Sequence, residues 1–182
     1  MIRRLVQKLK KMYYNSSNEL RIRYLINEGA KIGEGTRLNC NIDSFGSEPY
    51  LVSIGKNCLF AGDINFITHD GGIKVLNSLN YFNGARMDNI APIKIGDNVY
   101  IGFGACIMPG VTIGDNVIIG AGAIVTRDIN DNSVAVGIPA KVIKTIDEYY
   151  INVVERDRLF PTATLTRKEK REYFENLNIF KE

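Results

Sequence analysis

Residues 95–125 read IGDNVYIGFGACIMPGVTIGDNVIIGAGAIV, and every sixth residue of this stretch is a β-branched aliphatic. These positions are Ile95, Ile101, Ile107, Ile113, Ile119 and Val125. A strand repeats every two residues and a helix about every 3.6, so a strict period of six requires short extended segments separated by regular corners. The pattern predicts a β-solenoid in which each hexapeptide supplies one strand and one turn.

A second apolar line follows four residues behind the first, at Val99, Ala105, Val111, Val117, Ala123 and Ile129. Glycines and Asp-Asn pairs recur between the two lines, and these residues adopt corner geometry at little cost. We expect both lines to point inward and form a stacked core. The same register reappears upstream at Ile32, Ile54, Phe60 and Phe66, which extends the predicted solenoid over residues 31–144.

Composition favours one domain, because 182 residues with 45% hydrophobic content can build a sizeable core. The chain has no run of about 18 apolar residues and no signal-peptide pattern, which favours a cytoplasmic protein. Cys40, Cys58 and Cys106 match no metal-ligand spacing, so we expect reduced thiols and no metal. Cys58 falls on the inward apolar line.

The basic charge lies at the N-terminus, where residues 1–30 hold seven Lys or Arg and two acids. An apolar stripe predicts a helix there and consists of Ile2, Leu5, Val6 and Leu9. The stripe fits a membrane-surface helix, but we favour a helix packed on the solenoid or on a neighbouring subunit. The basic residues have no interleaved aromatic residues, so nucleic-acid binding is not expected.

Residues 145–182 lose the six-residue period and carry charged, helix-forming sequence that is interrupted near Pro161. Thr166 precedes a charged run and is predicted to cap a helix at its N-terminus. A solenoid has open apolar ends that need cover, so we expect this tail to form a helical cap.

The period fails once in the middle of the solenoid, where a loop at about residues 70–92 runs out of register. A loop of about twenty residues in a compact repeat domain is commonly either functional or disordered. His69, the only histidine of the protein, lies where this loop begins. Imidazole exchanges a proton near neutral pH, which makes His69 the candidate for acid-base catalysis. Its neighbours Thr68 and Asp70 could orient the ring or simply hold the turn.

Four motifs carry a resemblance to a known family: IGDNVYIG at 95–102, PGVTIGDN at 109–116, IGAGAIVTRD at 119–128 and VGIPAKVI at 136–143. They resemble the hexapeptide-repeat acyltransferases, and among these the galactoside, maltose and capsule O-acetyltransferases. The resemblance implies a left-handed parallel β-helix with a projecting loop, an exception to the usual right-handed crossover. It also implies a homotrimer with active sites between subunits, and acetyl-CoA as co-substrate with no permanently bound cofactor.

The same resemblance assigns roles to individual residues. His69 becomes the general base for an acceptor hydroxyl that attacks the thioester directly, and a backbone N–H near Gly102 to Ala105 of the adjacent subunit would stabilise the oxyanion. The residues expected along acetyl-CoA are Tyr100, Gly104, Ala121, Gly122, Thr126, Arg127, Lys141 and Lys144. The small residues among them also suit tight corners, and lone basic residues are often only solvated. Tyr100 stands where many relatives carry a tryptophan, so a stacking role there does not transfer directly.

Acceptor binding is assigned to Asn41, Asp43, Asp70 and Arg86. The predicted function is therefore acetyl-CoA-dependent O-acetylation of a saccharide, in surface-polysaccharide biosynthesis. Three alternatives stay open: N-acetylation of an amino-sugar nucleotide, O-acetylation of a xenobiotic such as an antibiotic, and a non-catalytic structural or binding solenoid. A zinc-dependent β-helix enzyme would need several histidines and is not expected.

Overall fold

The computed structural model describes residues 2–177, with side chains from Arg4 onward. The chain divides into two compact units, Met1–Asp147 and Glu148–Glu182. The boundary falls inside helix α4 (Ile146–Glu155), close to the predicted start of the helical tail. Each unit is described by itself.

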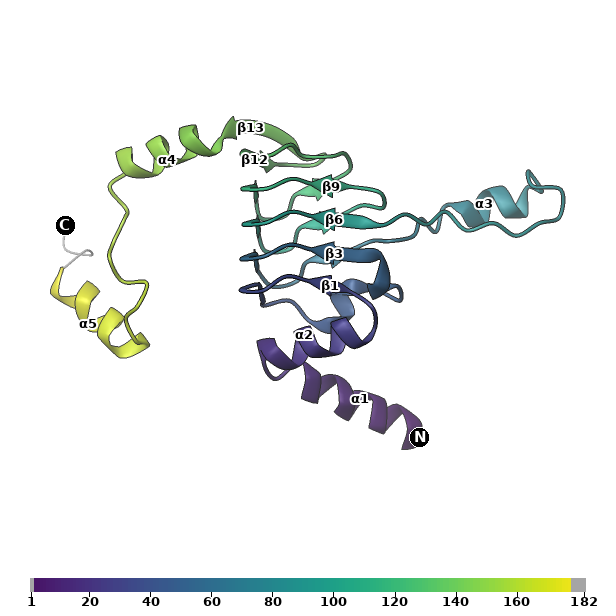
Figure 1. The fold of residues 1–182 in the computed structure, drawn as a ribbon, viewed down its shortest axis with the longest axis horizontal. Helices are drawn as coiled ribbons and strands as arrows, with labels where there is room; N and C mark the ends of the chain where they lie inside the picture. The colour runs from purple at the N-terminus through teal and green to yellow at the C-terminus, as the bar shows by residue number, and fades with distance from the viewer. Residues whose placement is uncertain (1, 178–182) are drawn as a thin grey trace. The chain divides into compact units, whose positions relative to one another are not determined.

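The first unit is a parallel β-helix whose short strands stack into a sheet on each of three faces (Figure 1). Face A contains β1 (Lys31–Ile32), β3 (Val52–Ile54), β6 (Ile93–Ile95) and β9 (Thr112–Ile113). Face B contains β2 (Arg37–Leu38), β4 (Leu59–Phe60), β7 (Tyr100–Ile101), β10 (Ile118–Ile119), β12 (Ser133–Val136) and β13 (Lys141–Thr145). Face C contains β5 (Asn65–Phe66), β8 (Cys106–Ile107) and β11 (Ile124–Val125).

The core confirms both predicted apolar lines, whose twelve residues are at most 5% exposed. Ile101 pairs with Ile119 across face B, and Ile107 pairs with Val125 across face C, so one coil consists of three hexapeptides. Burial of each such side chain contributes about 1.5 to 3 kcal/mol. The last strand departs from the pattern, because β13 runs antiparallel to β12.

The corner between faces A and B repeats an asparagine with a positive φ of 54–56°, at Asn57, Asn98, Asn116 and Asn132. The Asn98 amide donates to Oδ1 of Asn116 at 2.8 Å, which builds a ladder along the stacked corners. Asparagine tolerates this left-handed conformation better than most residues. A Cβ at Gly96 would collide with the carboxylate of Asp115 in the next coil. Close stacking of the corners therefore explains the recurring Gly-Asp-Asn motif.

Two helices precede the coils. Helix α2 (Asn18–Asn27) begins at the N-cap Ser17 and closes the first coil, because the Asn18 side chain bonds Thr36 O and Leu38 N on the open edge of β2. Helix α1 (Ile2–Tyr14) extends beyond α2, away from the coils (Figure 1).

The apolar stripe of α1 lacks the packing on the solenoid that was one of the two expectations, and packing on a neighbouring subunit stays a prediction. Leu5, Val6 and Leu9 are exposed and do not pack on the solenoid, because α1 is attached only near its C-terminal end. Ile2, the remaining member of the predicted stripe, lies outside the residues whose side chains are described.

The chain leaves the coils after β5 and returns at β6, and the intervening loop carries helix α3 (Ile73–Ser78) (Figure 1). In the coil before it, two short 3-10 helices replace the face C strand: η1 (Ile42–Phe45) and η2 (Pro49–Leu51). The regular coils are therefore interrupted twice in succession on the same side of the solenoid.

The second unit contains the rest of α4 and helix α5 (Arg167–Asn176). Thr166 caps α5 as predicted, in a capping box with Glu169, and the ring of Phe160 packs 5.0 Å from that of Phe174. Its role as a cap on the solenoid stays a prediction. Across residues 2–177, no helix is long and apolar enough to cross a membrane.

Candidate active site

His69 forms a hydrogen-bonded pair with Glu48, a residue that the sequence analysis did not single out. The imidazole Nδ1 lies 2.9 Å from Oε2 of Glu48. The His69 side chain is 51% exposed, whereas that of Glu48 is only 15% exposed. The ring is thus accessible on one side and held by a shielded carboxylate on the other.

The first coil of the β-helix positions Glu48 next to His69. Glu48 lies between η1 and η2, in the coil that precedes β5. Phe45 of η1 packs its ring 4.7 Å from the ring of Phe66 on β5, and both residues are buried. This contact fixes the irregular segment under the strand that leads into His69.

Three donors hold the Glu48 carboxylate in its ionised form. The hydroxyl of Ser47 donates to Oε1 at 2.6 Å, and the hydroxyl of buried Thr68 donates to Oε2 at 2.7 Å. Hydrogen bonds from Ser47, Thr68 and His69 lower the pKa of Glu48 from 4.5 to about 2. An ionised carboxylate only accepts hydrogen bonds, so Nδ1 of His69 is the nitrogen that donates to Glu48. In the neutral imidazole this tautomer puts the lone pair on Nε2.

Two backbone hydrogen bonds between the ends of the loop hold the residues on either side of His69. The N–H of Ala91 donates to Thr68 O at 2.9 Å, and the N–H of Asp70 donates to Asn89 O at 2.8 Å. The Asp70 carboxylate accepts from the Gly72 N–H at 2.8 Å, so it holds the turn and does not orient the ring. Thr68 contacts the ring only through Glu48. The orienting group is therefore Glu48, and neither sequence neighbour takes that role directly.

The remaining acceptor candidates lie on the two irregular segments. Asn41 precedes η1 and is exposed, whereas the carboxylate of Asp43 forms an ion pair of 2.8 Å with Lys11 of α1. Arg86 is exposed on the loop. Next to it, the Asn77 side chain donates a hydrogen bond to the C=O of Met87 and accepts one from its N–H. The structure thus gives Asp43 a contact that the sequence did not predict.

The acetyl-CoA candidates are spread over several parts of the β-helix. Gly104, Ala121 and Gly122 lie at the corner between faces B and C, and a Cβ at Gly104 or Gly122 would meet open space. Thr126 and Arg127 lie at the corner between faces C and A, which is also where His69 lies in an earlier coil. The other three are on strands of face B, Tyr100 on β7 and Lys141 with Lys144 on β13.

Among residues 102–105, at the corner between faces B and C, one backbone donor is available for an oxyanion. The N–H groups of Gly102, Gly104 and Ala105 already donate to backbone carbonyls. Within the described chain, the N–H of Phe103 donates to no protein acceptor, and the residue is exposed. Of the four residues from 102 to 105, Phe103 is therefore the one with a free amide.

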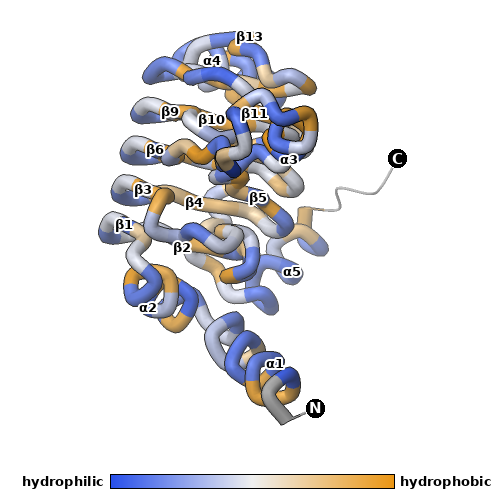
Figure 2. Tube along the Cα trace, turned by 90° about the vertical axis from the view of Figure 1, so that its right-hand side faces the viewer, coloured by the Kyte–Doolittle hydropathy of each residue, from blue (hydrophilic) through white to orange (hydrophobic). Residues whose placement is uncertain are grey.

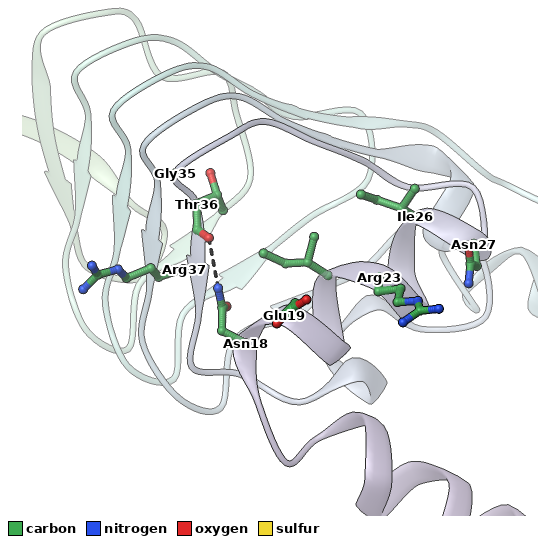
Figure 3. A pocket seen from close by; sticks show the side chains of 9 residues that line it. Asn18, Glu19, Arg23, Ile26, Asn27, Gly35, Thr36 and Arg37 are labelled. Atoms are coloured by element: carbon green, nitrogen blue, oxygen red, sulfur yellow. Dashed lines mark hydrogen bonds between the residues drawn. The ribbon is translucent and has the colours of Figure 1, made fainter.

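A separate groove of about 600 Å³ lies between α2 and the first coil (Figure 3). Its charged side chains are Glu19, Arg23 and Arg37, and it lies on the side of Thr36, at the corner between faces A and B. It contains no histidine and is at a different corner from His69, so we do not assign the chemistry to this groove.

A β-helix of hexapeptide coils with its histidine at the start of the long loop defines a hexapeptide-repeat transferase. A family model described as bacterial transferase hexapeptide (six repeats) matches residues 92–127. A solved maltose O-acetyltransferase from Clostridium difficile 630 is 31% identical, with a TM-score of 0.53 over 79% of this chain and 85% of that one. The chain belongs to the hexapeptide-repeat acyltransferases and is an acetyltransferase.

Two further relatives match most of the chain. Protein CapG of Staphylococcus aureus is 43% identical over 175 residues, which are 96% of this chain and 95% of CapG. A galactoside acetyltransferase solved in complex with coenzyme A is 29% identical, with a TM-score of 0.54 over 80% of this chain and 82% of that one. Membership implies that the coils wind left-handed, and it sets aside a non-catalytic solenoid.

Proposed function

We propose that this acetyltransferase moves the acetyl group of acetyl-CoA to a hydroxyl of a saccharide, in the biosynthesis of a surface polysaccharide. The observation that carries the proposal is the hydrogen bond from His69 Nδ1 to ionised Glu48. In the neutral ring this bond directs the lone pair to Nε2, and the side chain is 51% exposed, as a general base for a hydroxyl requires. The names of the maltose and galactoside enzymes support a sugar acceptor.

In the proposed reaction, Nε2 of His69 takes the proton from the acceptor hydroxyl as its oxygen attacks the thioester carbonyl. Glu48 stabilises the imidazolium that forms. The tetrahedral intermediate carries its negative charge on the former carbonyl oxygen, which accepts a hydrogen bond from the Phe103 N–H of a neighbouring subunit. The intermediate collapses by breaking the carbon–sulfur bond. The CoA thiolate then takes the proton from His69, which restores the neutral base.

The position of these groups on the coil supports a site between subunits of a homotrimer. His69 and Phe103 lie at two different corners, with face C between them in one chain. A neighbouring chain that presents its corner between faces B and C to the corner between faces C and A would bring the two groups together. The proposed trimer supplies this arrangement in each of its three interfaces.

The same arrangement provides a path for acetyl-CoA. Gly104, Ala121 and Gly122 leave the corner beside Phe103 open for the pantetheine arm. Arg127 and Lys141 place positive charge where the phosphates of CoA would lie, and Thr126, Lys144 and Tyr100 complete the proposed set. Acceptor binding is proposed for Asn41 and Asp43 at η1 and for Asp70 and Arg86 on the loop.

The test is release of free thiol from acetyl-CoA by the purified protein, measured across sugars, amino sugars, sugar nucleotides and antibiotics. We expect a saccharide to stimulate release and His69→Ala to abolish it, whereas Glu34→Gln, an exposed carboxylate variant at another corner, keeps the full rate. Mass determination by light scattering tests the trimer. Stimulation by an antibiotic alone, or full activity of His69→Ala, would refute the proposal.

A further inference from the structure

Helix α1 carries an exposed apolar stripe that nothing in the described chain covers. The stripe consists of Leu5, Val6, Leu9, Met12 and Tyr13, each of which is 56–62% exposed. At 3.6 residues per turn, these five side chains fall within about a third of the helix circumference. Figure 2 shows the alternation of hydrophobic and hydrophilic residues along α1. The helix is therefore strongly amphipathic, with its apolar side facing solvent.

The polar side of α1 is basic. Residues 1–18 contain five Lys or Arg and no acid. On the same helical geometry, Lys8 and Lys10 flank the apolar stripe on either side, and Arg4 with Lys11 lies on the opposite side. Lysines at the edges of an apolar stripe can extend their ammonium groups toward lipid headgroups while their alkyl stems cover apolar surface.

The contacts that hold α1 come from residues outside the stripe. Lys11 pairs with Asp43 at 2.8 Å, the Tyr14 ring packs 4.8 Å from that of Tyr24, and the Lys10 ammonium lies 5.6 Å from the centre of the Tyr24 ring. These contacts fix the helix at its C-terminal end and leave the apolar stripe pointing away from the chain. The stripe can therefore be buried in another phase without breaking any contact of the fold.

We propose that α1 binds the surface of an anionic lipid bilayer and holds the enzyme there. The stripe enters the boundary between headgroups and acyl chains, Lys8 at its edge contacts the lipid phosphates, and the other basic residues add to the positive charge of the helix. Charge favours an anionic lipid surface over a second copy of α1 as the partner of the stripe. Two such helices would bring like charges together, and neither helix has an acid to compensate them. The inference does not depend on the proposed acetyl transfer.

The test is flotation of the full-length protein with vesicles of equal parts phosphatidylglycerol and phosphatidylcholine, with pure phosphatidylcholine vesicles in parallel. We expect binding to the anionic vesicles that falls as salt is raised, since the electrostatic part is screened. The double variant Leu5→Glu/Leu9→Glu should lower partitioning by about a hundredfold, because two leucines no longer enter the bilayer. Lys8→Glu should lower it by at least about fivefold.

A matched control is Leu159→Glu, which changes an equally exposed leucine in the other unit. It should bind vesicles as the unchanged protein does, and circular dichroism with thiol release reports whether each variant is folded. Three results would overturn the proposal: no flotation with anionic vesicles, equal flotation with neutral vesicles, or full binding by the folded double variant. A change of oligomeric mass in the double variant without a change in flotation would assign the stripe to a second copy.

Discussion

Replacing Glu48 with glutamine removes the negative charge beside His69 and keeps a side chain of nearly the same shape. The amide oxygen can occupy the position of Oε2, where it still accepts from Thr68 and from Nδ1 of His69. The amide nitrogen then faces the Ser47 hydroxyl, which can rotate to accept its hydrogen bond. The ring keeps its position in this variant, so the change isolates the charge.

The size of the effect follows from the distance and the exposure of the pair. A unit charge about 4 Å from the centre of the imidazolium is worth about 4 kcal/mol at an effective dielectric constant near 20, and about 1 kcal/mol in water. His69 is 51% exposed, which places the interaction between these limits. We expect a loss of about 1 to 3 kcal/mol in the transition state, which lowers kcat by about 5-fold to 150-fold.

The assay is the initial rate of thiol release at saturating acetyl-CoA, across a range of pH. The loss should appear in kcat, with little change in KM for the acceptor, because the charge acts on the imidazolium that forms in the reaction. Glu48→Ala should lose more, since it also releases the ring. Glu34→Gln is the matched control and should keep the full rate. Full kcat in Glu48→Gln would refute the role of the charge.

Three further outcomes test the stability of the fold, two at the site and one at another corner. The pKa of Glu48 is lowered from 4.5 to about 2, so ionisation of Glu48 stabilises the fold above pH 4.5 and is lost as the pH falls toward 2. Urea unfolding should show a loss of at most about 3 kcal/mol from this group over that range, and Glu48→Gln should lack it. Thr68→Val removes a hydrogen bond to a shielded carboxylate and should lower the unfolding free energy by about 1.5 to 3 kcal/mol in the same assay. Asn116→Ala should lose about 1 to 2 kcal/mol because its φ is +56°, and Asn116→Gly should lose less; the reverse order would contradict the role of backbone conformation.

The regular part of the fold was predictable residue by residue. Ile101 and Val117 are buried because an apolar residue at a fixed place in each hexapeptide points into the interior of the coil. The cap of α5 was equally predictable, since Thr166 and Glu169 interact over three residues. Both signals are local or periodic, and neither requires knowledge of distant contacts.

The candidate site was only half predictable. His69 is conspicuous as the only histidine, at the start of the long loop. Glu48 precedes it by 21 residues, in a segment without the six-residue period, so no register connects the two in the sequence. A search for carboxylates in the other irregular segment would have found Glu48 as one candidate, but its hydrogen bond required the packing of Phe45 against Phe66.

The properties of the N-terminal helix α1 were likewise predictable only in part. Its amphipathic pattern was visible in the sequence, but the pattern did not say whether the stripe is covered. The structure shows that Tyr14 and Lys11 attach the helix from the other side, which leaves the stripe exposed.

The sequence by itself determined the β-helix, because a strict period of six leaves its apolar side chains only the interior of the coil. It also determined where the regularity ends, which is where we propose that the chemistry takes place. Only the tertiary structure decided that Glu48 shares a hydrogen bond with His69, that Phe103 keeps a free amide, and that the stripe of α1 is uncovered. These three properties depend on contacts between segments with no common period, and such contacts exist only once the coils have stacked.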